Sequence, residues 1–159
     1  IDMVGFTATC ASLRPSQVLH VLHDVWCLMD SAIIAYNNPS SRQSISSEAD
    51  KATDIRSMPR RTSLRGRPHE VFKMDTVGDA YIVAGVVRDP TDDHCNSLAF
   101  DFLDLAETIM RVIQHYSAKG AHGLEPGHVQ VRSGLALGPV SMGLLGLLQP
   151  RFHMYGKAM

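Results

Sequence analysis

Apolar positions along the chain predict two amphipathic helices. From residue 16 to residue 36 they recur every three or four residues, the spacing of one helical face, and Ser16 is a suitable N-cap. A second stretch with the same spacing begins after residue 93. The first face consists of Val18, Val21, Leu22, Val25, Met29, Ala32 and Ile33, and the second of Ala99, Phe102, Leu103, Ala106, Ile109, Met110 and Ile113. We expect each helix to bury this face.

Patterns typical of β-strands occur in the sequence before and after the second helix. Residues 71–74 and 81–87 are rich in β-branched and aromatic side chains, and a turn-forming segment at 75–79 predicts a hairpin between them. Residues 129–137 alternate as a third strand, and 152–155 form a short last one. This order of elements is typical of an α+β fold, a split β-α-β sandwich with helices packed on an antiparallel sheet.

Residues 37–70 have a different composition. They are rich in Ser and Arg, contain few large apolar side chains, and carry seven Lys or Arg against four Asp or Glu. Such a segment buries too little apolar surface to offset the entropy of ordering it. We interpret it as a flexible surface insertion within one domain that spans residues 1–159, a length that suits a single domain.

Composition and charge bear on which binding partners and which cellular compartment the chain suits. The formal net charge of −1 does not favour nucleic acid or an anionic membrane as a partner. No apolar run approaches the roughly 18 residues of a membrane span, and no signal peptide is evident. Cys10, Cys27 and Cys95 are widely spaced and odd in number, which favours buried or half-buried free thiols in a reducing compartment.

Two aspartates stand at positions suited to cation chemistry. Asp2 precedes a Val-Gly-Phe-Thr segment, and Asp79 follows Gly78 in the predicted hairpin turn. Carboxylates at adjacent strand ends can share a divalent cation, because Mg²⁺ commonly takes one or two carboxylates together with phosphate oxygens. A glycine turn also lets backbone N–H groups approach phosphate. Aspartates are equally common as simple turn formers, so spacing alone leaves both roles open.

Four segments resemble the class III adenylate and guanylate cyclases. Asp-Met-Val-Gly-Phe-Thr at 2–7 resembles that family's Asp-Ile-Val-Gly-Phe-Thr. Lys-Met-Asp-Thr-Val-Gly-Asp-Ala-Tyr at 73–81 resembles the Lys-x-Glu-Thr-Ile-Gly-Asp-Ala-Tyr hairpin of its guanylate branch. The strand at 131–140 and Pro-Arg-Phe-His-Met-Tyr-Gly at 150–156 follow in the family's order. The resemblance implies the ferredoxin-like cyclase catalytic fold, truncated at both ends.

The resemblance also assigns roles to residues. Asp2 and Asp79 match the aspartates that bind two Mg²⁺ or Mn²⁺ ions, with the Met3 carbonyl as a further ligand. The backbone of Gly5, Phe6 and Thr7 matches the loop that holds the triphosphate. The implied enzyme is a phosphorus–oxygen lyase, in which the ribose 3′-hydroxyl attacks the α-phosphorus and pyrophosphate leaves.

Base preference depends on Asp75 and His153. Asp75 stands where guanylate cyclases have Glu and adenylate cyclases have Lys, and a carboxylate can accept hydrogen bonds from N1–H and the 2-amino group of guanine. His153 departs from both branches, since imidazole can donate to guanine O6 or accept from the adenine amino group. We expect a guanylate cyclase that makes cyclic GMP from GTP, with an adenylate cyclase acting on ATP as the alternative.

The resemblance implies a head-to-tail dimer with shared sites. This chain holds both metal aspartates and base readers, so a homodimer is the simplest arrangement, with a heterodimer as the alternative. The family's transition-state Asn and Arg would lie beyond Met159, and Lys157 replaces a common Asp or Asn. We therefore expect little turnover from the fragment alone, and a catalytically silent regulatory domain is a third interpretation. The expected location is the cytosol or the cytosolic side of a membrane protein, with any membrane attachment outside these residues.

Overall fold

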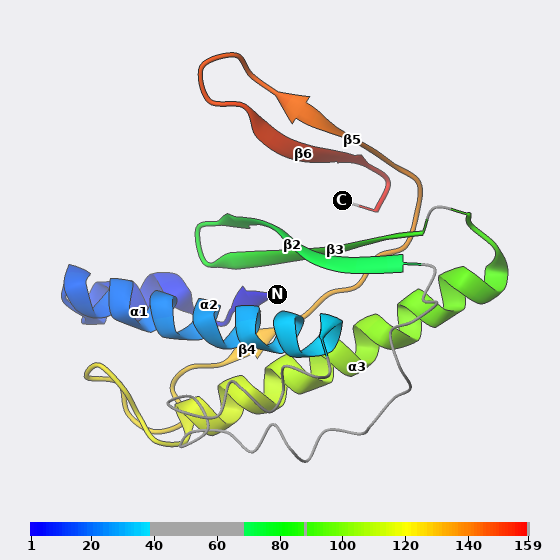
Figure 1. Cartoon of the computed structure of the whole chain (residues 1–159). Coiled ribbons are helices and arrows are strands. Elements are labelled where there is room, and N and C mark those ends of the chain that lie inside the picture. Colours follow the sequence, from blue (N-terminus) through cyan, green and yellow to red (C-terminus); the bar gives the residue numbers. More distant parts are fainter. Residues whose placement is uncertain (39–68, 88, 159) are drawn as a thin grey trace.

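The computed structural model describes residues 1–38, 69–87 and 89–158, which form helices and small antiparallel sheets (Figure 1). The helices are α1 (Phe6–Ser12), α2 (Pro15–Asn37) and α3 (Asp92–Ser117). The strands are β1 (Asp2–Met3), β2 (His69–Val77), β3 (Ala80–Val87), β4 (Val131–Arg132), β5 (Val140–Leu145) and β6 (Arg151–Gly156). The mixture of helices and strands confirms the α+β class.

Three antiparallel strand pairs organise the described part of the chain. β2 pairs with β3 through a tight turn at Gly78, β1 pairs with β4, and β5 pairs with β6. The backbone of Ile1 also exchanges hydrogen bonds of 3.0 and 2.7 Å with the backbone of Tyr81 on β3. These bonds place β1 between β3 and β4.

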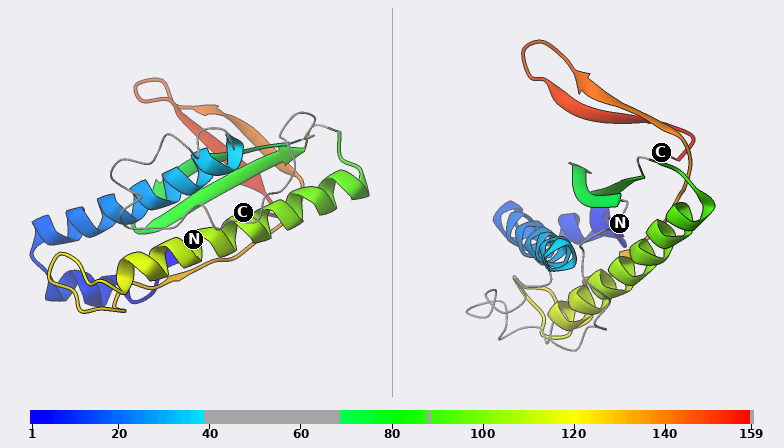
Figure 2. Two further views of the ribbon diagram at one scale, coloured as in Figure 1. Left: turned by 60° about the horizontal axis from the view of Figure 1, so that its bottom comes forward. Right: turned by 45° about the vertical axis from the view of Figure 1, so that its right-hand side comes forward.

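The core lies between the two long helices and the β2–β3 hairpin. α2 and α3 pack against this hairpin and lie below it in Figure 1 and in the right-hand view of Figure 2. The most deeply buried side chains of this cluster are Val21, Val25, Met29, Val71, Tyr81, Ile109 and Ile113. Burial of these apolar side chains is the main force that holds the hairpin to the helices.

A polar contact also joins the hairpin to α2. The hydroxyl of Tyr81 donates a hydrogen bond to Asp30, which pairs with the Lys73 ammonium at 3.1 Å. That ammonium lies 4.8 Å from the centre of the Tyr81 ring. The buried phenol is therefore satisfied by a charged partner, as buried polar groups generally are.

The β5–β6 hairpin stands apart from the helices. It projects away from α2 and α3, with β6 on the side of the β2–β3 hairpin (Figure 2). Phe152 on β6 meets Phe72 on β2 edge-to-face, with ring centroids 6.2 Å apart. At the tip of the projecting hairpin, Leu147 and Leu148 are each 95% exposed.

The first predicted helix is confirmed as α2, within one residue at each end. Its buried face includes five residues of the predicted stripe, Val21, Val25, Met29, Ala32 and Ile33. The predicted cap is wrong: Arg14 occupies the N-cap position, and its amide donates to the Gln17 side chain at 3.0 Å. Pro15 takes the first helical position, where a missing N–H costs nothing.

The second helix is confirmed as α3, but its buried face was predicted only in part. Ile109 and Ile113 are buried, whereas Leu103 and Met110 are 53% and 44% exposed. Leu98, Leu105 and Val112 are buried in their place. α3 carries two adjacent apolar stripes, and packing against α2 and the hairpin decides which of them is buried.

Several predicted strand boundaries change. β2 continues through Val77, so only Gly78 and Asp79 form the turn expected at 75–79. The strand expected at 129–137 shortens to β4, because β1 offers it two residues to pair with. A strand at β5 and a helix at α1 form where neither was expected.

Most of the expected insertion at 37–70 lies outside the described residues, so the flexible surface segment stays a prediction. Residues 39–68 lie outside the described part of the chain, whereas Asn37 ends α2 and β2 begins at His69. The three cysteines are free as expected, but Cys27 is exposed rather than buried or half-buried.

The sequence analysis found no apolar run of membrane-spanning length, but α2 as a whole is strongly apolar. One 18-residue window of the helix has a mean hydropathy of 1.4, so by length and composition alone α2 could cross a membrane. Its most apolar face nevertheless supplies Val21, Val25 and Met29 to the core. This buried face packs against α3 and β2.

Candidate functional site

Asp79 is held against β1 by the turn of the β2–β3 hairpin. Gly78 adopts φ 62°, a left-handed conformation that glycine accepts without strain. In the next residue, Asp79 Oδ2 accepts a hydrogen bond of 3.3 Å from the Met3 amide. The structure therefore brings Asp79 to the strand that carries Asp2, although the two lie 77 positions apart in sequence.

Asp2 is paired with a cation. From the neighbouring strand β4, Arg132 donates to Asp2 Oδ2 through Nε at 2.8 Å and Nη2 at 2.7 Å. The Arg132 side chain is 75% exposed, so the pair contributes at most about 1 kcal/mol to stability. Sequence analysis missed this partner. It lies within the 131–140 motif, but only the register of β1 on β4 shows that it faces Asp2.

The oxygen atoms at this strand end suit a hard divalent cation. The carboxylates of Asp2 and Asp79 and the carbonyl of Met3 are donors of the type that Mg²⁺ and Mn²⁺ prefer. In the described ranges, no group of three or more His, Cys, Asp or Glu side chains is placed to hold a metal ion. Because Mg²⁺ usually completes its shell with waters and phosphate oxygens, two carboxylates fit an ion that binds together with a nucleotide.

The segment after β1 presents backbone amides. Gly5, with φ 68°, occupies the N-cap position of α1, and no side chain caps this helix. The first amides of a helix have no partner within it, so those of Phe6 and Thr7 are available to phosphate oxygens. The Val4 amide donates to the Gln130 carbonyl at 2.9 Å and anchors this segment beside β4.

The two predicted base-reading residues lie on different hairpins. Asp75 is half-buried on β2 at a β-bulge, and its Oδ1 accepts from the Thr76 amide at 2.7 Å. His153 is half-buried on β6, where its ring stacks on Tyr155 with centroids 5.9 Å apart. Within the described residues, Asp75 and His153 form no hydrogen bond with each other.

A second polar cluster, formed by Asp24, Tyr116 and His122, is structural. The Asp24 carboxylate accepts from the Tyr116 hydroxyl at 3.1 Å and contacts His122 Nε2 at 2.7 Å. Burial, and then the Asp24 charge, raise the pKa of the Tyr116 hydroxyl above its ordinary value. The Gln17 side chain donates to the His122 carbonyl at 2.7 Å. These contacts attach the loop after α3 to α2.

Comparison with known proteins agrees with the sequence motifs. Residues 49–159 match the model of the adenylate and guanylate cyclase catalytic domain. The chain is 26% identical over 155 residues to guanylate cyclase soluble subunit beta-2 of Rattus norvegicus, covering 98% of this chain and 17% of that protein. It is 30% identical over 156 residues to guanylate cyclase soluble subunit alpha-1 of Bos taurus, covering 98% and 16%.

A receptor-type relative is similar to this chain at a comparable level of identity. The chain is 28% identical over 156 residues to receptor-type guanylate cyclase Gyc76C of Drosophila melanogaster, covering 98% of this chain and 8% of that protein. The chain thus spans less than a fifth of the length of each of these curated relatives. Because the family model covers well over half of the residues, the chain belongs to the class III family of adenylate and guanylate cyclase catalytic domains.

Proposed function

We propose that this chain is part of a catalytic domain that converts GTP to cyclic GMP and pyrophosphate. The observation that carries the proposal is the hydrogen bond from the Met3 amide to Asp79, which holds one carboxylate beside the strand that bears the other, Asp2. The motif matches and the guanylate cyclase relatives support the same reaction.

In this proposal the metal-binding groups are Asp2, Asp79 and the Met3 carbonyl. Two divalent ions bound there, Mg²⁺ or Mn²⁺, would supply charge neutralisation at the phosphates and activation of the 3′-hydroxyl. The backbone amides from Gly5 to Thr7 would hold the triphosphate. Arg132 would leave Asp2 Oδ2 when the site fills, which its 75% exposure and position at a strand edge allow.

Guanine selection is assigned to Asp75, with His153 as the second base-reading residue. A carboxylate that faces the N1–H and 2-amino groups of guanine accepts a hydrogen bond from each. Facing adenine, which has no such pair of donors on that edge, the same carboxylate would lack hydrogen-bond donors. Adenylate cyclase activity is the alternative, because imidazole can also accept from an adenine amino group.

The strand order supports a ferredoxin-like split β-α-β sandwich. The pairings of β1 with β4 and of β2 with β3 combine with the Ile1–Tyr81 backbone bonds into the order β4-β1-β3-β2, antiparallel throughout. α2 and α3 connect β1 to β2 and β3 to β4, and they pack against each other under this sheet.

We further propose that the domain works as a dimer on the cytosolic side. The names of two relatives describe subunits of a soluble guanylate cyclase, and a third is a receptor-type enzyme. Since this chain carries candidate groups of both kinds, a homodimer with two equivalent sites is the simplest assembly.

A catalytically silent regulatory domain is the second candidate function. The ion pair between Asp2 and Arg132 favours it, because an internal cation already neutralises one of the two carboxylates. Retention of both aspartates argues for the enzyme instead.

The deciding experiment uses the domain extended at both ends. It is incubated with Mn²⁺ and either GTP or ATP, and cyclic GMP, cyclic AMP and pyrophosphate are quantified by mass spectrometry. Cyclic GMP that disappears in the Asp79→Ala variant would support the proposal. Cyclic AMP in its place would contradict the role of Asp75, and a folded dimer without product would leave the silent domain.

A further inference from the structure

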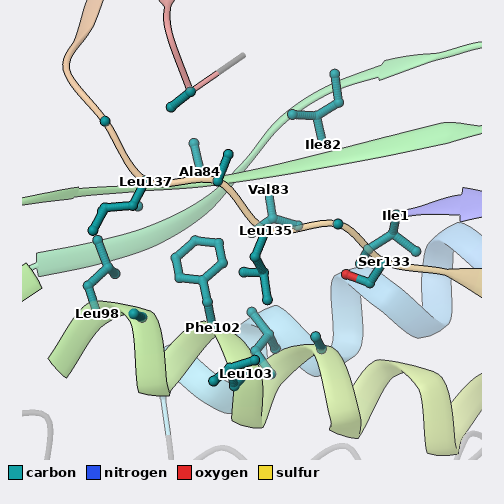
Figure 3. A pocket seen from close by; sticks show the side chains of 18 of the residues that line it. Ile1, Ile82, Val83, Ala84, Leu98, Phe102, Leu103, Ser133, Leu135 and Leu137 are labelled. Carbon is teal, nitrogen blue, oxygen red and sulfur yellow. The ribbon is translucent and has the colours of Figure 1, made fainter. Parts of the chain in front are cut away.

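A cavity of about 680 Å³ lies between β3, α3 and residues 133–138. Figure 3 shows Leu98, Phe102 and Leu135 around it, and none of the described residues that line it has a charged side chain. Such a lining suits apolar groups and not a triphosphate, because a charge buried without partners is costly. Groups that orient phosphate oxygens therefore lie elsewhere in the domain.

At the start of α1, the Thr9 side chain joins two segments that are far apart in sequence. Its hydroxyl donates to the Gly5 carbonyl at 3.3 Å and lies 3.2 Å from Nε2 of His128, 119 positions away. A hydroxyl has one hydrogen, so donation to Gly5 leaves its oxygen to accept from a His128 tautomer that carries the proton on Nε2. We call these two hydrogen bonds the His128–Thr9–Gly5 bridge.

The segment that carries the imidazole is itself held in the core. Val129 is 5% exposed and belongs to the buried cluster between the helices and the β2–β3 hairpin. In the next residue, the Gln130 carbonyl accepts from the Val4 amide at 2.9 Å. This segment therefore contacts the chain on both sides of Gly5, at Val4 and at Thr9.

The bridge acts on the direction of one peptide unit. The Gly5 carbonyl accepts from the Thr9 amide at 3.1 Å as well as from the Thr9 hydroxyl. The C=O of Gly5 and the N–H of Phe6 belong to the same planar trans unit, so they point in opposite directions. With the carbonyl directed into α1, the Phe6 N–H is directed out of the helix. Gly5, at φ 68°, has wide conformational freedom, so this unit depends on its hydrogen bonds for its orientation.

We infer that Thr9 and His128 are positioning residues for triphosphate binding, which hold the Gly5–Phe6 peptide unit with its N–H toward the phosphate oxygens. The inference rests on the triphosphate role proposed above for the backbone from Gly5 to Thr7. A threonine hydroxyl that bonds to the carbonyl four residues earlier is by itself common in helices. The contact with His128 is what distinguishes Thr9, because it ties the peptide unit to a segment anchored in the core.

Loss of the bridge should weaken binding more than chemistry. Neither side chain would touch the nucleotide, since both act through the Gly5 carbonyl. The Phe6 N–H would contact the triphosphate both before and during the reaction. An interaction present to the same extent in the ground state and the transition state changes KM and leaves kcat nearly unchanged.

The test uses Thr9→Val, which keeps the side-chain shape and removes the hydroxyl, in the domain extended at both ends. 3′-Deoxy-GTP with Mn²⁺ is the binding probe, because it lacks the attacking hydroxyl and cannot be cyclised. Thr9→Val should raise the Kd for this probe and the KM for GTP by about three- to tenfold, the usual worth of one hydrogen bond, with kcat changed by less than about twofold. Thr9→Ser retains the hydroxyl and should restore the wild-type values.

Two further variants separate positioning from helix stability. Ser12→Ala is the matched control, because the Ser12 hydroxyl donates to the Thr9 carbonyl at 2.8 Å on the same helix without reaching Gly5. It should leave the Kd unchanged. His128→Leu removes the other end of the bridge at an exposed position and decides the question if Thr9→Val fails to fold. The double variant should bind no more weakly than either single one, since both break the same bridge.

The outcomes distinguish this inference from the proposed function. Unchanged affinity in His128→Leu, an equal loss in Ser12→Ala, or losses that multiply in the double variant would overturn the positioning role. A domain that binds 3′-deoxy-GTP through the bridge but makes no cyclic GMP from GTP would retain the positioning role and lose the cyclase proposal. A wild-type domain that binds no triphosphate would overturn both.

Discussion

The β2–β3 and β5–β6 hairpins are both antiparallel, but their surroundings are very different. The β2–β3 hairpin packs on α2 and α3, and its Val71 and Tyr81 are 2% and 0% exposed. The β5–β6 hairpin projects outward, and Tyr155 on β6 is 60% exposed. Each bears candidate site residues, Asp75 and Asp79 on the first and His153 on the second.

The comparison shows that the parts of the proposed site differ in rigidity. Asp79 is positioned by a core-anchored hairpin and by a hydrogen bond to β1. His153 is positioned by a hairpin whose recorded ring contact with the rest of the domain is the Phe72–Phe152 pair. The proposed metal ligand Asp79 thus lies on the hairpin anchored in the core, while the proposed base-reading residue His153 lies on the projecting hairpin.

The largest expected effect is a difference between the two hairpins in how much a tyrosine substitution lowers the free energy of unfolding. Tyr81→Ala should lower the free energy of unfolding by about 3–5 kcal/mol, because it empties a fully buried site and leaves Asp30 without its hydroxyl partner. Tyr155→Ala, on the exposed face of β6, should change it by less than about 0.5 kcal/mol. Urea unfolding measures both, and similar losses would show that the β5–β6 hairpin is equally anchored.

The next largest effect is a difference in catalytic consequence between substitutions in the two hairpins. In the domain extended at both ends, Asp79→Asn keeps an oxygen that can accept from the Met3 amide but removes a charge. It should lower cyclase turnover by about 100-fold, or 2.7 kcal/mol, with an unchanged melting temperature. His153→Ala should instead alter the preference for GTP over ATP by roughly tenfold or less. Product quantification with both nucleotides checks this, and a comparable loss of turnover in both variants would contradict the division of roles.

A smaller effect concerns alkaline pH. Burial, the hydrogen bond to Asp30 and the charge of Asp30 raise the pKa of Tyr81 above its ordinary value of about 10. The folded state then retains a proton that the unfolded state loses. The stabilisation is complete below pH ~10 and declines above it, by up to about 1.4 kcal/mol per pH unit. Tyr81→Phe should flatten this decline, and identical pH profiles in urea unfolding would disprove the assignment.

The smallest effect on stability is expected at the tip of the β5–β6 hairpin. Leu147→Ser combined with Leu148→Ser should change the free energy of unfolding by less than about 0.5 kcal/mol, because both side chains are 95% exposed. Contiguous exposed apolar surface often belongs to an interaction site, so if this tip contributes to the proposed dimer contact the same variant should weaken self-association in sedimentation experiments. Unchanged association would separate this tip from the proposed dimer contact.

Local sequence determined the elements whose signals are short-range. The apolar period from residue 16 to residue 36 predicted α2 within a residue at each end, and the turn-forming segment at 75–79 predicted the β2–β3 hairpin. The motifs around Asp2, Asp79 and His153 also predicted the family, because they are contiguous strings that need no knowledge of the fold.

Only the tertiary structure decided features that depend on which surfaces meet. α3 has two apolar stripes, and contact with α2 and β2–β3 buries Leu98, Leu105 and Val112 rather than Leu103 and Met110. The strand predicted from residue 129 to residue 137 is limited to β4 because pairing requires a neighbour, and β1 supplies two residues.

The candidate site shows the same division. Sequence identified Asp2 and Asp79 as candidate ligands, but it did not show that Arg132 neutralises one or that the Met3 amide holds the other. Those contacts join residues more than 70 positions apart. They arise from the register of β1 between β3 and β4, which is set by long-range packing and backbone hydrogen bonding rather than by any local pattern.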